Sequence, residues 1–278
     1  KVKYRATVIS IVVSVAVFIG VYSFIGLVSL ATGIYYQRTA YQLLAYSYGE
    51  DSYEKALAIA ELEGIEQVEV RRTTRFIVGP EQREIPYTQG YKEMYGLDWD
   101  HKAAIMVVAL GDRGYEQYCR ELGVDPETAG DMAIVNAHFE FDVDENGKRY
   151  HYEGDAAQYN NGDIIDFMDN ETGNIYEIPV LLQTEKKPMC MSGSTYNMVS
   201  LIVSDSWWDE HDFNSVMMDI GVFVRCEDAD ALEETIRRDF DLRDFNIYNY
   251  DREYRSSRSM YLAVAIFLYG FIIVVSLI

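Results

Sequence analysis

Apolar residues form long uninterrupted stretches at both ends of the chain. No charged residue occurs between Arg5 and Arg38, and none follows Arg258. About 20 apolar residues are enough to cross the hydrocarbon core of a bilayer. The pattern predicts a cytoplasmic flank and a first transmembrane helix in residues 1–38. It also predicts a second transmembrane helix, truncated within a longer polytopic protein, in residues 259–278.

The first apolar stretch has a second interpretation, a cleaved signal peptide. Lys1, Lys3 and Arg5 form a basic start, and Ser29-Leu30-Ala31 resembles a small-residue cleavage site. The apolar core of a signal peptide is shorter, at about 7 to 15 residues, so the membrane helix is favoured. Because basic flanks remain in the cytoplasm, residues 39–258 are predicted to be an extracytoplasmic domain of a multi-pass cell-membrane protein.

Helical spacing continues beyond the first apolar stretch. In residues 37–48, Tyr41, Leu44, Ala45 and Tyr48 fall on one face of a helix. The spacing predicts a helical stalk that projects from the membrane.

Strands and amphipathic helices then alternate on both sides of the middle of the domain. The predicted helices are at 51–65, after Asp112 and after Asp228, and the predicted strands are at 67–78, 103–110, 219–226 and 245–250. Strands that alternate with helices of this length are typical of a split βαβ sheet with helices on one face. We assign this αβ core to residues of about 50–125 and 204–250.

Turn signals replace the helical period between the two halves of the αβ core. Asn146-Gly147, Asn161-Gly162 and the turn at 169–173 separate stretches that are typical of strands. We therefore predict a β-rich subdomain, at about 130–203, inserted into the αβ core. The fold class is α+β.

Residues 142–153 match the calcium-loop pattern D-x-[DN]-x-[DN]-G-x5-E, with Asp142, Asp144, Asn146 and Glu153 among the oxygen ligands. The flanking residues alternate between apolar and polar, however, and the Asn-Gly pair lies at the centre of this alternation. That pattern is typical of a β-hairpin, whereas a calcium loop of this type joins two helices. We predict a hairpin turn without bound metal.

Acidic side chains outnumber basic ones by 45 to 24, and three of the basic ones lie in the first five residues. This field repels nucleic acid, which excludes that class of partner. Two interpretations of the acidity remain open. The acidic surface, with Asp142, Asp144 and Asp169, attracts a cationic peptide, or it is a solvated face that keeps the domain soluble.

Two apolar motifs are candidates for contact with a partner. Met189-Cys190-Met191 has the soft ligands that cuprous copper prefers, but methionine is also common on adaptable binding surfaces, so a contact loop is favoured. In Trp207-Trp208, helical periodicity predicts one side chain in the core and the other half exposed. The candidate partner-contact residues are Met189, Met191, Trp207, Asp142, Asp144 and Asp169.

No set of residues typical of an enzyme is found in the sequence. The histidines are scattered, and Cys119, Cys190 and Cys226 have neither disulfide-framework nor zinc spacing. A glycine-rich phosphate loop is also absent. We expect no catalytic residue, no metal and no cofactor in this chain.

The order of these features resembles the FtsX-like and MacB-like permeases of ABC transporters. The resemblance rests on a basic flank, a serine-dotted first span (TVISIVVSVAVFI), residues 64–68 (GIEQV), the helix start at 109–112 (ALGD), the β insertion, and a strand-helix-strand leading into a second span. It implies a porter-like αβ domain with an inserted β-rich subdomain, flanked by two transmembrane α-helices.

The resemblance also implies mechanotransmission. A cytoplasmic ABC ATPase, separate or fused, would bind ATP and drive a homodimer or paired permease in the membrane lipid, and the external domains would move. The external partner would be a cationic peptide or an envelope protein, in peptide export, resistance or envelope processes. The alternative is a two-span sensory receptor that signals to a cytoplasmic output domain.

Overall fold

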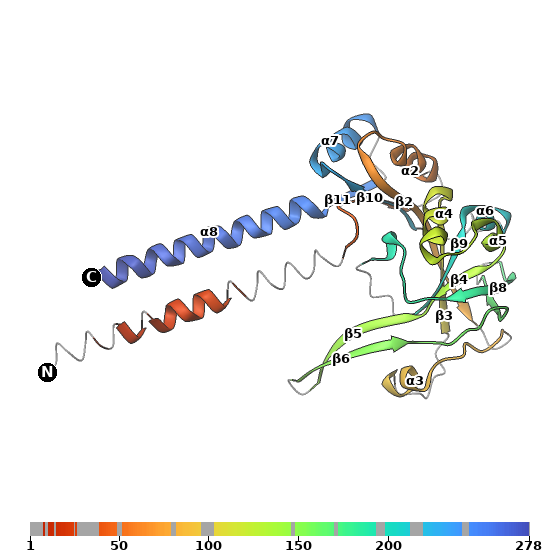
Figure 1. The fold of residues 1–278 in the computed structure, drawn as a ribbon, viewed down its shortest axis with the longest axis horizontal. Coiled ribbons are helices and arrows are strands. Elements are labelled where there is room, and N and C mark those ends of the chain that lie inside the picture. The colour runs from red at the N-terminus through yellow and green to blue at the C-terminus, as the bar shows by residue number, and fades with distance from the viewer. Residues whose placement is uncertain are drawn as a thin grey trace. The chain divides into compact units, whose positions relative to one another are not determined.

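A computed structural model describes most of the chain. The described residues are 8, 11–13, 15–24, 26, 39–48, 52–78, 82–95, 103–145, 148–169, 172–192, 198–211, 219–240 and 245–277. They belong to two compact units (Figure 1). We call Lys1–Thr39 with Asn249–Ile278 the terminal unit, and Ala40–Tyr248 the sheet unit.

Most of the described residues of the terminal unit are helical. Its described residues between 8 and 26 are helical, and α8 covers Tyr250–Leu277. The aromatic rings of Phe18 and Tyr269 lie 5.4 Å apart between centroids, so the two helical segments are in contact. Within the part of the chain that the structure describes, no helix is long and apolar enough to cross a membrane. The two transmembrane helices therefore stay predictions.

The sheet unit is built on nine strands in the order β11-β1-β10-β2-β3-β9-β4-β8-β7 (Figure 1). In chain order these are β1 Leu43–Tyr48, β2 Ile65–Val78, β3 Ala103–Leu110, β4 Ala133–Asn136, β7 Ile164–Met168, β8 Ile175–Gln183, β9 Val199–Ser204, β10 Asp219–Cys226 and β11 Phe245–Asn249. The helical elements are α2 Ser52–Ala60, α3 Gln89–Tyr95, α4 Asp112–Leu122, α5 Pro126–Ala129, the 3-10 turn η1 Met189–Met191, α6 Asp205–Glu210 and α7 Ala229–Asp239.

The predicted split βαβ arrangement is present. β1 and β2 are joined through α2, and both pair antiparallel with β10, which lies between them. The connection from β10 through α7 to β11 likewise skips over β1. The expectation of a mixed fold with helices packed on a large sheet is therefore confirmed.

The predicted insertion contributes most of its strands to this same sheet. β9 pairs parallel with β3, and β4 pairs antiparallel with β9. β7 closes back on β2 through the pair Ile77 and Met168. Every side chain of β4 and of β9 is buried, which is typical of strands covered on both faces. Only one hairpin among the described residues, β5 His138–Glu145 with β6 Lys148–Asp155, forms a separate sheet.

The predicted helical stalk is wrong for residues 43–48, which form β1. Leu43 and Ala45 are fully buried, while Leu44 and Tyr46, which alternate with them, are less so. This short segment fits a period of two as well as the helical period, and pairing with β10 satisfies its backbone over six residues. Residues 39–42 are described and are not helical either, and residues 37 and 38 lie outside the described residues.

Side chains cap the starts of two helices, and the start predicted after Asp112 is shifted by one residue. Asp228 caps α7, since its side chain accepts the N–H groups of Asp230 and Ala231. Ser204 caps α6 in the same way. Asp112 was expected to cap α4 but is its first residue, because Gly111 occupies the cap position.

Candidate functional site

The Met189-Cys190-Met191 motif forms the buried turn η1 rather than an exposed loop. Glu69 on β2 accepts the backbone N–H groups of Met189 at 3.0 Å and of Cys190 at 2.7 Å. Arg71, on the same strand, donates to the Cys190 carbonyl at 3.3 Å. All three side chains of the motif are buried. The expected contact loop is therefore not present as a surface, because β2 holds it inside the sheet unit.

The chemistry of this turn is structural. Burial raises the pKa of Glu69, and the two N–H groups that it accepts oppose that shift. Burial also raises the pKa of the Cys190 thiol well above its usual range, and the nearby Glu69 adds to the effect. A thiol must ionise to act as a nucleophile or soft metal ligand, so Cys190 is held in its inert form.

Trp207 and Trp208 are both buried, so the expectation that one is half exposed is wrong. The reason is the ion pair beneath α6. Arg72 on β2 donates through Nε to Asp205 Oδ1 at 2.8 Å and through Nη1 to Asp209 Oδ1 at 2.6 Å. Its guanidinium lies 5.4 Å from the centre of the Trp208 ring. These contacts fix α6 on the sheet with both indoles inside.

The electrostatics of this ion pair contain two opposed effects. Burial raises the pKa of Asp205 to about 7, and the charge of Asp209 adds to the shift. The two N–H groups that Arg72 directs at Asp205 Oδ1 favour the ionised form instead. Charge-assisted contacts this short are typical of a formed ion pair, so we treat Asp205 as the partner of Arg72 and not as a free acid.

Asp169 lies in the turn between β7 and β8 and is almost fully buried. Its carboxylate accepts the Thr172 hydroxyl at 2.8 Å, and its backbone N–H donates to Asn174. It shapes the predicted turn and offers no surface to a partner. Asp142 and Asp144 lie on β5, but their side chains fall outside the described residues. The candidate contact residues are thus spread over η1, α6, a turn and β5, and the structure gathers no single site from them.

The match to the calcium-loop pattern belongs to the predicted hairpin, which is confirmed. β5 and β6 pair antiparallel, with Asp142 opposite His151 and Glu140 opposite Glu153. Asp142, Asp144 and Glu153 of the pattern are therefore distributed along two extended strands, whereas a calcium loop winds its ligands around the ion. The absence of metal at this motif stays a prediction.

A pocket of about 610 Å³ lies beside the base of this hairpin. It is lined by Pro86, Tyr87, Asp155, Gln158, Tyr159, Asn160, Gln183, Thr184 and Glu185. Gln183 secures one wall, because its Oε1 accepts the Tyr159 N–H and its Nε2 donates to the Ala157 carbonyl. Burial raises the pKa of Tyr87 to about 12, so its hydroxyl is neutral at physiological pH. The wall is polar and fixed, which suits a small polar ligand or an ion.

The sequence analysis did not identify this pocket. Its lining comes from the segment before α3, the end of β6, the turn after it and the end of β8. No local spacing connects these segments. The two carboxylates, Asp155 and Glu185, are the chemically distinctive part of the lining.

Comparison with known proteins finds similarity to solved structures. No protein-family model matches the chain, and no curated protein matches it either. Among solved structures, the chain is similar to the periplasmic region of MacB from Actinobacillus actinomycetemcomitans, with a TM-score of 0.37 and 10% identity. The alignment covers 79% of this chain and 94% of the other. The resemblance noted in the sequence names the same family.

Proposed function

We propose that the chain is part of a membrane permease subunit of the ABC-transporter type, in which the sheet unit is extracytoplasmic and relays movement of the terminal unit. A partner ATPase supplies the energy, since the sequence contains no glycine-rich phosphate loop with which this chain would bind ATP itself. The proposal assigns no reaction to the chain.

The observation that carries the proposal is the position of β1 and β11. They are the first and last strands of the sheet unit, and they are neighbours in the sheet. The two charge-free segments of the terminal unit are therefore joined to adjacent strands at one edge. A displacement of either segment acts first on this edge.

The sheet offers a continuous path inward from that edge. β1 pairs with β10 over six residues, β10 with β2 over most of its length, and β2 with β3 over eight residues. Backbone hydrogen bonds make such a sheet stiff along its ladder. The buried contacts of Glu69 and Arg72 then tie η1 and α6 to β2. Movement at the edge would be passed on as a rigid displacement.

Large apolar side chains of the terminal unit support its placement in lipid. Ile266 and Phe267 on α8 are 63% and 72% exposed. Water is an unfavourable solvent for such side chains, and a bilayer is a favourable one. Aromatic contact between Phe18 and Tyr269 is compatible with two helices that pack inside a membrane.

Cysteine labelling tests the topology. Cys119, Cys190 and Cys226 are buried, so they give little background. In intact cells, a membrane-impermeant maleimide should label Glu127→Cys, on an exposed position of α5, and should not label Lys3→Cys until the cells are opened. Labelling of both variants, or of neither, in intact cells would contradict the proposed placement.

Purification of the tagged full chain from its native membranes tests the partner. We expect a co-purifying ABC ATPase, identified by mass spectrometry, and an ATP-dependent change in hydrogen exchange of β1 and β11. A Gly-Gly insertion between Thr39 and Ala40 should abolish that change and leave ATP hydrolysis largely intact. The same insertion after Glu63, in an exposed turn, is the matched control.

Two results would reject the relay. One is loss of ATP hydrolysis in proportion to loss of the exchange response. The other is recovery of a signalling output protein in place of an ATPase, which would favour the sensory receptor.

A further inference from the structure

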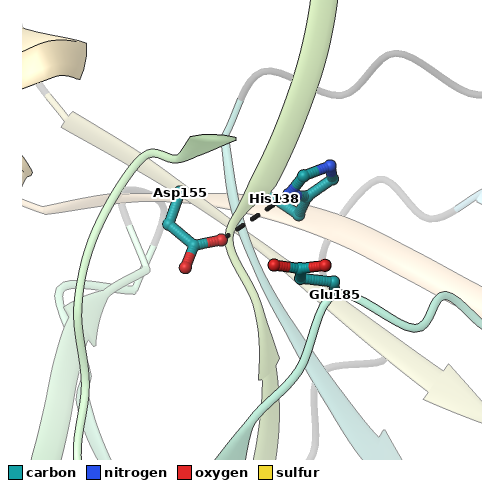
Figure 2. A group of neighbouring side chains, drawn as sticks. All are labelled: His138, Asp155 and Glu185. Carbon is teal, nitrogen blue, oxygen red and sulfur yellow. Dashed lines mark ion pairs between the residues drawn. The ribbon is translucent and has the colours of Figure 1, made fainter. Parts of the chain in front are cut away.

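We propose that His138, Asp155 and Glu185 form a binding site for a divalent transition metal ion of the zinc class. One ligand atom from each lies within 4.8 Å of the other two. Figure 2 shows the three side chains converging from separate segments. His138 begins β5, Asp155 ends β6, and Glu185 follows β8. The inference is independent of the proposed function.

The imidazole of His138 is placed as a metal ligand should be. Its side chain is 15% exposed, and Nδ1 is buried without a hydrogen-bond partner. Nδ1 lies 3.7 Å from Asp155 Oδ1, so this nitrogen is on the side of the ring that faces the carboxylate. Leaving such a nitrogen unpaired is costly, and a metal ion would satisfy it.

The second nitrogen of the same ring has the partner that metal-binding histidines usually have. His138 Nε2 lies 3.7 Å from Glu153 Oε1. This distance is longer than a hydrogen bond, but a carboxylate that closed on Nε2 would orient the ring and favour the tautomer whose other nitrogen is free to bind metal. Glu153 is therefore a positioning residue in this proposal and not a ligand.

The two carboxylates bring negative charge that no described lysine or arginine neutralises. Among the described residues, no lysine or arginine forms an ion pair with Asp155 or Glu185. Lys186 Nζ lies 2.8 Å from Glu121 Oε2 instead. Burial lowers the pKa of Lys187, and the charge of Glu140 opposes that shift. A bound cation would supply the missing charge.

The backbone around each ligand is fixed. The Ala156 N–H donates to Ala137 at 2.8 Å, and the Thr88 hydroxyl donates to the Asp155 carbonyl at 2.7 Å. On the other side, the Thr184 N–H donates to Val135 and the Asn136 side chain donates to the Thr184 carbonyl. Only side-chain rotation is needed to close the ligands around an ion, whose bonds to nitrogen and oxygen are about 2.0 to 2.2 Å long.

One imidazole with two carboxylates selects for the class of ion. Imidazole suits zinc and its neighbours, while an all-oxygen set would suit calcium or magnesium. Three protein ligands leave a coordination position open. Asp155 and Glu185 both line the 610 Å³ pocket, so that position would face the pocket and could take water or a small ligand. The ion would also fasten the base of the hairpin to the end of β8.

Calorimetric titration of the chelator-treated full chain in detergent tests the proposal. With zinc ions we expect one saturable site per chain, at least roughly tenfold tighter than any calcium binding. Zinc should also raise the midpoint of thermal unfolding, because it binds the folded state. Glu185→Gln should weaken zinc binding at least tenfold, and since Glu185 is exposed, that variant should fold normally. His138→Gln should abolish the site, and Glu153→Gln should weaken it by about 10- to 100-fold.

His151→Gln is the matched control, because His151 is the other histidine of the hairpin and faces Glu153 at 3.7 Å. It should leave zinc binding unchanged. The proposal is overturned if zinc shows no saturable site, if binding survives both Glu185→Gln and His138→Gln, or if His151→Gln removes it. If calcium binds more tightly than zinc and Glu153→Ala abolishes that binding, the ion belongs instead to the calcium-loop motif at 142–153.

Discussion

The two units of the chain treat the same residue types in opposite ways. In the sheet unit, the large apolar side chains Ile202, Trp208 and Phe76 are almost completely buried. In the terminal unit, Ile266 and Phe267 are mostly exposed. Burying one such side chain is worth about 1.5 to 3 kcal/mol in water. The terminal unit forgoes this gain at many positions, and this difference supports the proposal that the terminal unit lies in lipid.

Charges are also distributed differently. On α8, the charged residues lie in the first turns, where Arg255 and Asp251 form an exposed pair at 3.2 Å. The sheet unit places charges inside, and Glu69 and Arg72 are both buried with polar partners. The sheet unit should therefore be sensitive to the loss of a charge, and the terminal unit to the gain of one.

The largest effect is expected for Arg72→Met. It leaves Asp205 buried without its partner, and removing one member of a buried pair costs about 3 to 5 kcal/mol. Urea unfolding of the full chain in detergent, followed by tryptophan fluorescence, measures the loss, because Trp208 lies next to Arg72.

Arg113→Met is the control for that experiment. Arg113 and Glu61 pair at 3.2 Å, but their side chains are largely exposed, so the loss should be below about 1 kcal/mol. Equal effects of the two variants would mean that the Arg72 pair is solvated, and the contrast between buried and exposed charges in the sheet unit would fail.

A second, smaller effect is expected for Ile266→Asp in the terminal unit. If α8 lies in a bilayer, a carboxylate near its centre raises the free energy of membrane insertion by roughly 2.5 to 3.5 kcal/mol. Ile175→Asp is the matched control, because Ile175 is 53% exposed at the start of β8 in the sheet unit. It should change stability by about 0.5 kcal/mol or less. An insertion assay in membranes measures the effect of Ile266→Asp, and urea unfolding measures that of Ile175→Asp. If Ile266→Asp does not change insertion, α8 does not lie in lipid.

The sequence predicted the elements better than their arrangement. The strand at Ala103–Leu110 and the β5–β6 hairpin agree with the expected residues, because apolar runs and period-two alternation are local signals. β1 was missed because the apolar positions of a six-residue segment fit both the helical period and the period of two of a strand. Pairing with β10, which is far away in the chain, selects the strand. The pairing of β3 with β9 is likewise non-local, so the insertion could not be recognised as part of the sheet.

The candidate metal site shows how much could have been inferred. A two-residue turn at Asn146-Gly147 pairs residues that are equidistant from it, which places His138 opposite Asp155. That half of the site follows from the hairpin prediction alone. Glu185 could not be added, because its approach depends on how β8 lies beside β4. The prediction that Met189-Cys190-Met191 forms a contact loop was wrong for a related reason. The contact of this motif with Glu69 on β2 is non-local and is visible only in the structure.

The smallest change in stability is expected when a glycine is replaced by alanine, and one glycine in each unit provides the comparison. Gly123 ends α4 in the left-handed region, with φ of 72°, and its N–H donates to the carbonyl of Arg120. An added Cβ meets nothing within 4 Å, so the cost of Gly123→Ala is conformational, at about 1 kcal/mol. Gly270 lies inside helix α8, and there too a Cβ meets nothing within 4 Å. Alanine is favoured over glycine in a helix by about 1 kcal/mol, so Gly270→Ala should not destabilise its unit.

Urea unfolding of both variants provides the measurement, with the tryptophan signal reporting the sheet unit. A loss for Gly123→Ala alone means that the end of α4 is held in place by the packing of the sheet unit. A neutral Gly123→Ala would mean that this turn relaxes freely, and that the sheet unit is less rigid than a relay of movement requires.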